Sequence, residues 1–338
     1  MGILLFMNLF LLVNLTRSQD SLLKNENWNL SINKNGTIAS LTYRQSNFTV
    51  PFYNGKNAGP LLYLKEDDQT VILPLSVKET AMQTGYYDNI SYSLGYKEEN
   101  GRLLVVAKVR NNRNTPFQPT TFGLKLGLDT YMDEYPNWES KLFPTLLRCE
   151  KNHFWGYFMS PLGKILLIAS PDPVASWSHD YSQSWGIPPY QFQGHRITSV
   201  NIDLINALPL PERHPQNLWQ LMPGEEKIFR FYFEHIEKLD NVLQKTSIIN
   251  KAPMLNLPKT AIPKNGEIEF SVYAQSLPNI KITDPEDKKN DLSPYSQCGN
   301  KYYFRYEDTF HEGIYNIEAK SPDGKISNGR FYVRKPYN

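Results

Sequence analysis

Cysteine is scarce in this chain of 338 residues, which contains only Cys149 and Cys298. Their separation fits neither the spacing of metal-binding cysteines nor a Cys-x-x-Cys redox motif, so we expect no cysteine-based metal or redox site. The two residues fall in segments that we assign below to different domains. We therefore expect two free, buried thiols, although an exported chain would also permit a Cys149–Cys298 disulfide.

An excess of charge of one sign is also missing. The chain has 36 Lys and Arg residues against 34 Asp and Glu residues, and its formal net charge is +2. A nucleic-acid-binding protein needs a concentrated basic face, so this balance removes the electrostatic argument for a nucleic-acid partner. The sequence lacks a phosphate-binding loop, a dinucleotide-binding fingerprint and the Gly-x-Ser-x-Gly elbow of hydrolases. We predict no cofactor and no bound metal.

Long apolar runs are confined to the N-terminus. Residues 3–15 are nearly all apolar, which matches a signal-peptide core and is too short to cross a hydrocarbon layer of about 30 Å as a helix. Thr16 and Ser18 place small residues before a cleavage site after Ser18, although no Lys or Arg precedes the run. We predict a signal peptide over residues 1–18, no transmembrane segment, and export to the periplasm or the exterior. The alternative is a buried N-terminal strand or helix.

Aromatic residues and proline are abundant, at 13% of the chain and 24 residues respectively, and this composition suits short strands joined by many turns. Alternating apolar and polar residues, interrupted by Asn-Gly pairs at residues 35–36 and 100–101, predict β-hairpins. Phe229, Phe231 and Phe233 recur at the period of a strand and share one face. The pattern predicts long antiparallel strands in a two-sheet sandwich.

The predicted fold class is all-β, with four segments. After the signal peptide, residues 19–235 form a large antiparallel supersandwich. Residues 236–265 form a linker, in which helical spacing over 236–249 gives a short helix and the prolines that follow give an extended linker or edge segment. Residues 266–338 carry five short strand candidates, the density of a small Ig-like sandwich, although no Cys…Trp…Cys core marks an antibody-type domain.

The most informative stretch for function is the predicted loop over residues 172–190. It is long, polar and aromatic, and long loops of this kind between strands are often functional. Flat aromatic faces stack on sugar rings, while His, Asp and Gln bond their hydroxyls, so the composition suits a carbohydrate groove. The alternative is that the tryptophans pack the sandwich core or clamp the loop. The candidate carbohydrate-binding residues are Asp172, Trp177, His179, Tyr181 and Trp185.

Catalytic constellations are weak in this sequence. Several carboxylates lie near the aromatic stretch, but no spacing selects a pair for glycoside hydrolysis. A metal site through His179, Asp180 and His195 is disfavoured, because adjacent residues point to opposite faces of a strand. We therefore assign no catalytic residue and expect no hydrolase or lyase turnover from this chain alone.

Several motifs resemble one known architecture. They are the opening hairpin over residues 28–43, the motif Arg148-Cys149-Glu150 followed by residues 153–157, the Ser-Pro-Asp-Pro loop at residues 170–173, and the strand entry at residues 221–224. Together they resemble the N-terminal β-supersandwich, a galactose mutarotase-like fold, of exported bacterial polysaccharide-degrading enzymes with six-hairpin (α/α) barrels, and the Gln after the cleavage site is similar to Bacteroidetes signal peptides. The small sandwich resembles the Ig-like linker of these enzymes.

The resemblance implies a poly- or oligosaccharide partner and a non-catalytic carbohydrate-binding or scaffolding role within a glycoside hydrolase or polysaccharide lyase. The catalytic residues of such enzymes lie mostly on the barrel, and this sequence ends before a barrel begins, so the resemblance also implies a missing C-terminal (α/α) barrel. Two alternatives stay open. One is a free-standing sugar mutarotase or epimerase-like protein, in which His179 or His195 would act with Asp172 or Asp203. The other is a surface interaction protein that uses the Ig-like module.

Overall fold

The computed structural model describes residues 21–335, apart from residues 34, 54–57, 68, 80, 131–137 and 183–195. In this part the chain forms five β-sheets, one 3-10 turn and one α-helix, so the prediction of an all-β fold is confirmed. The predicted signal peptide, residues 1–18, lies outside the described residues. No helix in the described part is long and apolar enough to cross a membrane.

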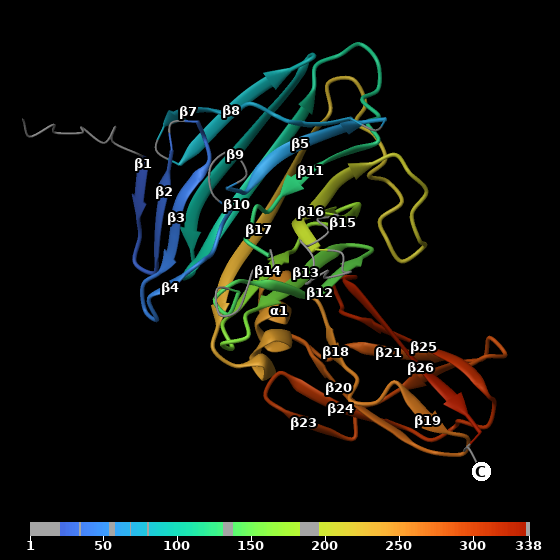
Figure 1. The fold of residues 1–338 in the computed structure, drawn as a ribbon. Coiled ribbons are helices and arrows are strands. Elements are labelled where there is room, and N and C mark those ends of the chain that lie inside the picture. The colour runs from blue at the N-terminus through green and yellow to red at the C-terminus, as the bar shows by residue number, and fades with distance from the viewer. Residues whose placement is uncertain are drawn as a thin grey trace, which may run out of the picture.

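The largest sheet has eight antiparallel strands in the order β12-β13-β14-β17-β10-β9-β8-β7 (Figure 1). The predicted β9–β10 hairpin is present. Its turn residues Asn100 and Gly101 have φ angles of 53° and 77°, a left-handed conformation that Asn and Gly tolerate best. The strands are β7 (Ser76–Glu79), β8 (Met82–Tyr87), β9 (Ile90–Glu99), β10 (Arg102–Asn111), β12 (Phe143–Glu150), β13 (His153–Met159), β14 (Ile165–Ser170) and β17 (Glu226–Ile236).

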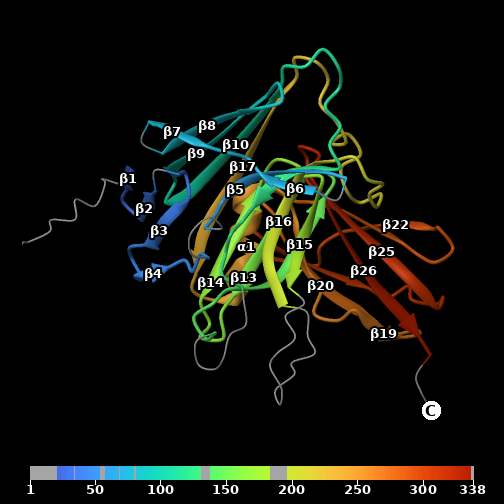
Figure 2. The same cartoon turned by 45° about the horizontal axis from the view of Figure 1, so that its top comes forward.

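Two smaller sheets complete the large sandwich. A five-stranded sheet in the order β15-β16-β11-β5-β6 packs against the eight-stranded sheet, and a four-stranded sheet in the order β1-β2-β3-β4 covers one end of it (Figure 2). The strands are β1 (Ser21–Lys24), β2 (Trp28–Ile32), β3 (Ile38–Tyr43), β4 (Phe48–Thr49), β5 (Leu61–Glu66), β6 (Gln69–Ile72), β11 (Thr121–Lys125), β15 (Ser176–Ser182) and β16 (Arg196–Asn206).

One continuous apolar core lies between these sheets. Each sheet contributes alternate residues to it, including Trp28 from β2, Phe122 from β11 and the predicted Phe229, Phe231 and Phe233 face of β17, all at most 2% exposed. Burial of side chains this large is the main stabilising contribution to such a sandwich, at about 1.5–3 kcal/mol each. The remaining face of β17 points away from the core, and its side chains are therefore available for contacts outside the sandwich.

The one α-helix of the described residues is shorter than the sequence predicts. We expected helix over residues 236–249, whereas the 3-10 turn η2 covers Leu239–Asn241 and α1 covers Val242–Asn250. The prediction was wrong at its start because Ile236 still pairs with Ile165 at the end of β17. Helix α1 lies on the outer face of β13 and β14, where Val242 and Ile249 join Trp155 in a separate apolar cluster.

A small sandwich follows, with a four-stranded sheet in the order β18-β20-β24-β23 and a five-stranded sheet in the order β19-β26-β25-β21-β22. All five predicted strands of this region are present, and the short, mostly exposed strands β22 and β23 were missed. Two strands arise within the proline-containing stretch. The strands are β18 (Met254–Asn256), β19 (Ala261–Pro263), β20 (Ile268–Tyr273), β21 (Asn279–Thr283), β22 (Lys289–Leu292), β23 (Ser296–Cys298), β24 (Lys301–Tyr306), β25 (Gly313–Lys320) and β26 (Ile326–Arg334).

Two further expectations need correction. Residues 172–190 do not form a continuous loop, because Ser176–Ser182 is the edge strand β15. Its alternation of aromatic and hydroxyl side chains is a strand pattern that lacks aliphatic residues, so it reads as a loop. Both cysteines are free, but only Cys149 is buried. Cys298 is exposed because β23 is a short edge strand without a buried side chain.

Polar contacts join the two sandwiches between the β12–β13 turn and the β25–β26 turn. The backbone N–H of Ile326 donates to Asn152 Oδ1, and Asn328 Nδ2 donates to Glu150 at the end of β12. In the other direction, Arg148 donates to the backbone oxygen of Asn328 in β26 and Asn152 Nδ2 to that of Gly324. Lys325 Nζ donates to the backbone oxygens of Asn152 and Pro171. This set of bonds between the two sandwiches, called the inter-lobe contact below, includes three charged residues, Arg148, Glu150 and Lys325, and a buried histidine, His153.

Candidate functional site

Strand β15 places Trp177 and His179 on the face of the five-stranded sheet that points into the sandwich. They pair with Ile202 and Val200 of β16, which are both fully buried in the core. The two rings meet edge to face, with centroids 4.9 Å apart and planes at 80°. Both side chains are half-buried because β15 is an edge strand. Burial lowers the pKa of His179 and the neighbouring Asp180 opposes that shift, so the imidazole is neutral at pH 7.

The opposite face of the same strand supports a buried carboxylate. Asp203 on β16 accepts hydrogen bonds from Tyr63 Oη at 2.5 Å, from Ser176 Oγ at 2.5 Å and from Ser178 Oγ at 3.1 Å. Only 3% of Asp203 is exposed, and burial raises its pKa while the hydroxyl donors oppose the rise. Asn206 donates to Ser176 in turn. Because each carboxylate oxygen is occupied, this cluster fixes the sheet rather than offering a free base.

Towards the rim, this face becomes accessible. Asp180 is 49% exposed along its side chain, pairs with Lys125 at 3.3 Å and accepts from Asn201 Nδ2 at 3.2 Å. Such a row of carboxylate, ammonium and amide groups can exchange hydrogen bonds with the hydroxyls of a sugar. The edge of the five-stranded sheet therefore offers an aromatic–imidazole pair on one side and hydrogen-bonding groups on the other.

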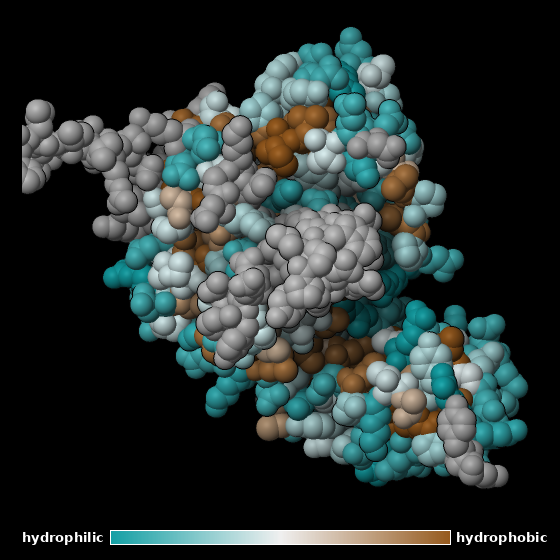
Figure 3. All heavy atoms as spheres, viewed as in Figure 1, coloured by the Kyte–Doolittle hydropathy of each residue, from teal (hydrophilic) through white to brown (hydrophobic). Residues whose placement is uncertain are grey.

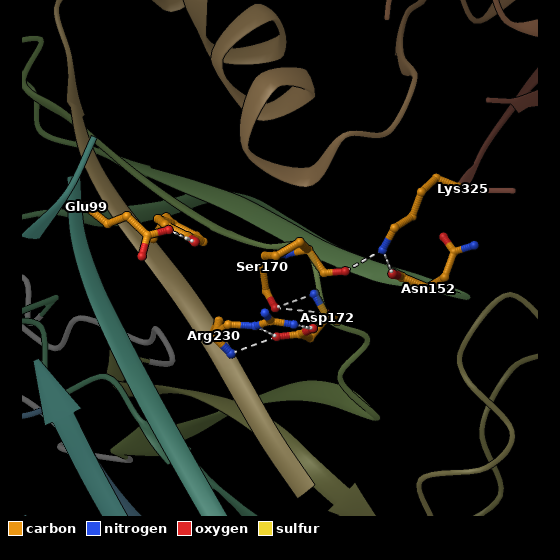
Figure 4. Close-up of polar contacts among 8 residues, drawn as sticks. Glu99, Asn152, Ser170, Asp172, Arg230 and Lys325 are labelled. Atoms are coloured by element: carbon orange, nitrogen blue, oxygen red, sulfur yellow. Dashed lines mark hydrogen bonds and ion pairs between the residues drawn. The ribbon is translucent and has the colours of Figure 1, made fainter. Parts of the chain in front are cut away.

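The structure separates Asp172 from the other candidates. Asp172 follows β14 and binds Arg230 of β17 in a bidentate pair, with Nε–Oδ2 at 2.8 Å and Nη2–Oδ1 at 2.6 Å (Figure 4). It also accepts the backbone N–H of Arg230 at 3.0 Å. Arg230 lies on the outer face of the eight-stranded sheet, since Phe229 and Phe231 face the core. Both oxygens of Asp172 are therefore engaged on a different sheet from Trp177.

Beside this pair lies a second polar contact on the same outer face. Tyr232 Oη donates to Glu99 Oε1 at 2.7 Å (Figure 4). Burial, with the neighbouring Glu99 carboxylate, raises the pKa of Tyr232 to about 12. Sequence analysis missed Tyr63, Arg230, Tyr232 and Glu99, because each lies in an otherwise ordinary strand pattern and only the sheet pairing brings its partner near.

Two of the candidate carbohydrate-binding side chains lie outside the described residues. The backbone of Tyr181 belongs to β15, but its side chain lies outside the described residues, and so do Trp185 and the alternative histidine, His195. Of the other tryptophans near this stretch, Trp155 is buried under α1 and Trp138 meets Phe143 edge to face at 6.5 Å. The described site thus retains Trp177 and His179 as the pair that the structure brings together.

The face assignment limits the chemistry of this site. His179 points toward the sandwich core, and Asp203 points to the opposite face of the sheet. A general acid and a general base must reach the same substrate, so these two residues cannot form the acid–base pair of a mutarotase. Trp177 and His179 can stack on a ring on one face of the strand, and Asp180, Lys125 and Asn201 can bond hydroxyls on the other face.

Comparison with known proteins agrees with the fold. No family model matches this chain, and no curated protein matches its sequence. A solved polysaccharide lyase has a similar structure, with a TM-score of 0.62 and 12% sequence identity over 93% of this chain. A galactose mutarotase-like protein from Lactobacillus casei aligns over 64% of this chain and 99% of its own length, with a TM-score of 0.33 and 12% identity. The chain spans 48% of the lyase, so both sandwiches together correspond to about half of that protein.

Proposed function

We propose that this chain is the carbohydrate-binding, non-catalytic portion of an exported polysaccharide-degrading enzyme. The observation that supports it most is the fold match to a polysaccharide lyase, which extends over 93% of the chain and therefore includes both sandwiches. The edge-strand pair Trp177 and His179 supplies a surface of the chemistry that a sugar needs. In this proposal residues 1–18 direct export and a helical (α/α) barrel on the same or another chain supplies catalysis.

Binding by the isolated chain is expected to be weak. Half-buried rings at one strand edge offer a single stacking surface, and we expect a dissociation constant of about 1 mM, equivalent to about −4 kcal/mol. Of the alternatives, the mutarotase loses one of its acid–base pairs because His179 and Asp203 lie on opposite faces. An interaction role for the small sandwich alone would not account for the fold match, which also extends over the large sandwich.

Trp177→Ala tests this proposal. We expect it to lower the affinity for polysaccharide, measured by retardation in polysaccharide-containing native gels, about fivefold, because a stacked ring contributes about 1 kcal/mol. The matched control is Trp219→Ala, which removes a tryptophan that is 44% exposed elsewhere on the large sandwich and should leave retardation unchanged. Circular dichroism checks that both variants are folded. Unaltered migration of the wild-type chain in every neutral and acidic polysaccharide would contradict the proposal.

A further inference from the structure

A large groove separates the two sandwiches (Figure 3). Its volume is about 1610 Å³, above the roughly 300–1,000 Å³ of sites for small molecules, so it has room for several units of a chain-like ligand. One wall comes from β12, β13 and α1, and the other from the small sandwich. Trp155, Tyr157 and Tyr273 are among the lining residues.

A strip of tyrosines runs from this groove over the outer face of the sheet β18-β20-β24-β23. Figure 1 shows this sheet below α1. Tyr273 on β20 pairs with Lys301 on β24, and both line the groove. Tyr303 follows two residues along β24, on the same face as Lys301, and its ring lies 6.4 Å from that of Tyr295. Tyr295 is 55% exposed. The strip of Tyr273, Lys301, Tyr303 and Tyr295 is therefore in part open to solvent.

The ammonium of Lys301 is the charged centre of this strip. Its Nζ lies 5.2 Å from the ring centroids of both Tyr273 and Tyr303, and the described residues provide no carboxylate ion pair for it. The next cation along the strip differs, because Arg305 is paired with Glu269 at 2.5 Å. Lys301 is thus held between two tyrosine rings without a carboxylate partner among the described residues, which favours an anionic group on the ligand.

The groove itself is mixed in charge. Arg148, Lys151, Arg213 and Arg330 line it together with Glu212, Asp240 and Glu318. Its charge alone therefore does not select a polyanion. What distinguishes the strip is the position of the Lys301 ammonium between the rings of Tyr273 and Tyr303.

We propose that the strip Tyr273–Lys301–Tyr303–Tyr295 binds an acidic glycan, with a carboxylate or sulfate group at Lys301 and sugar rings stacked on the tyrosines. This rests on the proposed carbohydrate-binding function, and it names the ligand class at a second surface apart from Trp177. Stacking on the tyrosine rings allows binding at any position along the glycan chain. The charge of Lys301 favours acidic glycans over neutral ones.

The experiment measures binding of the whole chain to polygalacturonate, chondroitin sulfate, neutral dextran and a single-stranded oligonucleotide at about 20 mM and 300 mM salt. We expect both acidic glycans to bind more tightly than dextran, and more weakly at the higher salt because exposed charges are then screened. Lys301→Gln should weaken acidic-glycan binding about three- to tenfold, and Tyr303→Ala by a similar factor. A preference between the two acidic glycans identifies carboxylate or sulfate as the favoured group.

Matched controls remove the same groups elsewhere on the small sandwich. Lys289→Gln removes an exposed ammonium, and Tyr332→Ala removes a ring that stands beside Arg334 at 5.6 Å; neither should alter binding. Equal affinity for dextran, or equal affinity for the oligonucleotide, would overturn the inference. If Trp177→Ala weakens glycan binding while the Lys301 and Tyr303 variants do not, the inference fails and the proposed function stands. If no glycan binds at all, both fail.

Discussion

Arg148→Met is expected to lower the free energy of unfolding by about 3 kcal/mol, because it breaks an ion pair with a buried carboxylate. Its guanidinium lies 3.0 Å from Glu150, whose side chain is 1% exposed, and it donates to the backbone oxygen of Asn328 at 2.6 Å. Burial raises the pKa of Glu150, and Arg148 opposes that rise. Removing Arg148 leaves a buried carboxylate without its ion partner, and this is costly. Urea denaturation measures the loss.

Two further variants separate this cause from general damage. The double variant Arg148→Met, Glu150→Gln removes both charges. Its free energy of unfolding should lie within about 1 kcal/mol of the wild-type value. Lys227→Met breaks the more exposed pair with Glu225, at 2.9 Å, and should cost less than about 1 kcal/mol. If the double variant is as unstable as Arg148→Met alone, the loss comes from packing and the account of a buried ion pair is wrong.

Acidification is expected to weaken the molecule through His153. Its Nδ1 contacts Asn152 Oδ1 at 3.2 Å and its Nε2 contacts Ser327 Oγ at 3.3 Å, within the inter-lobe contact. Burial, with the nearby charges of Lys325 and Arg148, lowers the pKa of His153 to about 3. The unfolded chain binds a proton near pH 6.5, so the unfolded state takes up protons first and stability falls from about pH 6.5 down to about pH 3.

His153→Gln is the comparison that isolates the imidazole of His153, since carboxylates in general titrate in the same pH range. Between pH 6.5 and pH 4.5 the wild-type chain should lose about 2 kcal/mol more stability than the variant. His311→Gln, which removes an exposed imidazole, controls for the loss of a histidine as such. If the free energies of unfolding of wild type and His153→Gln change with pH in parallel, the pKa of His153 is the same in the folded and the unfolded chain, and this account is wrong.

The sequence predicts the architecture well where hydrophobic alternation is strict. The β9–β10 hairpin and the Phe229, Phe231 and Phe233 face of β17 follow from side-chain period and turn chemistry alone. The start of α1 does not, because the pairing of Ile236 with Ile165 is a long-range interaction that overrides local helical spacing. Strand β15 was missed because its alternation of aromatic and hydroxyl residues lacks aliphatic side chains, and the buried carboxylate that Ser176 and Ser178 contact lies on another strand.

The candidate site, too, could be predicted from the sequence only in part. Trp177 and His179 were chosen for their chemistry, and the strand does bring them together, two residues apart on one face. Asp172 was chosen for the same reason, yet its partner is Arg230, 58 residues later in the sequence. No local pattern identifies that partner, because the pairing of β14 with β17 decides which side chain reaches Asp172. The functional meaning of such residues depends on sheet register, which spacing alone does not provide.

The central claim is that this chain binds carbohydrate at the edge of the five-stranded sheet. Its most direct test is a nuclear magnetic resonance titration that follows the indole N–H signals of the tryptophans. The ligand is a soluble oligosaccharide derived from the polysaccharide that retards the chain most in the native gels. Trp177→Phe assigns the Trp177 signal. The account predicts that this signal shifts progressively up to about 10 mM ligand, consistent with a millimolar dissociation constant, while the signal of the fully buried Trp28 stays fixed. A titration in which the Trp177 signal does not move, while the ligand binds elsewhere or not at all, would contradict it.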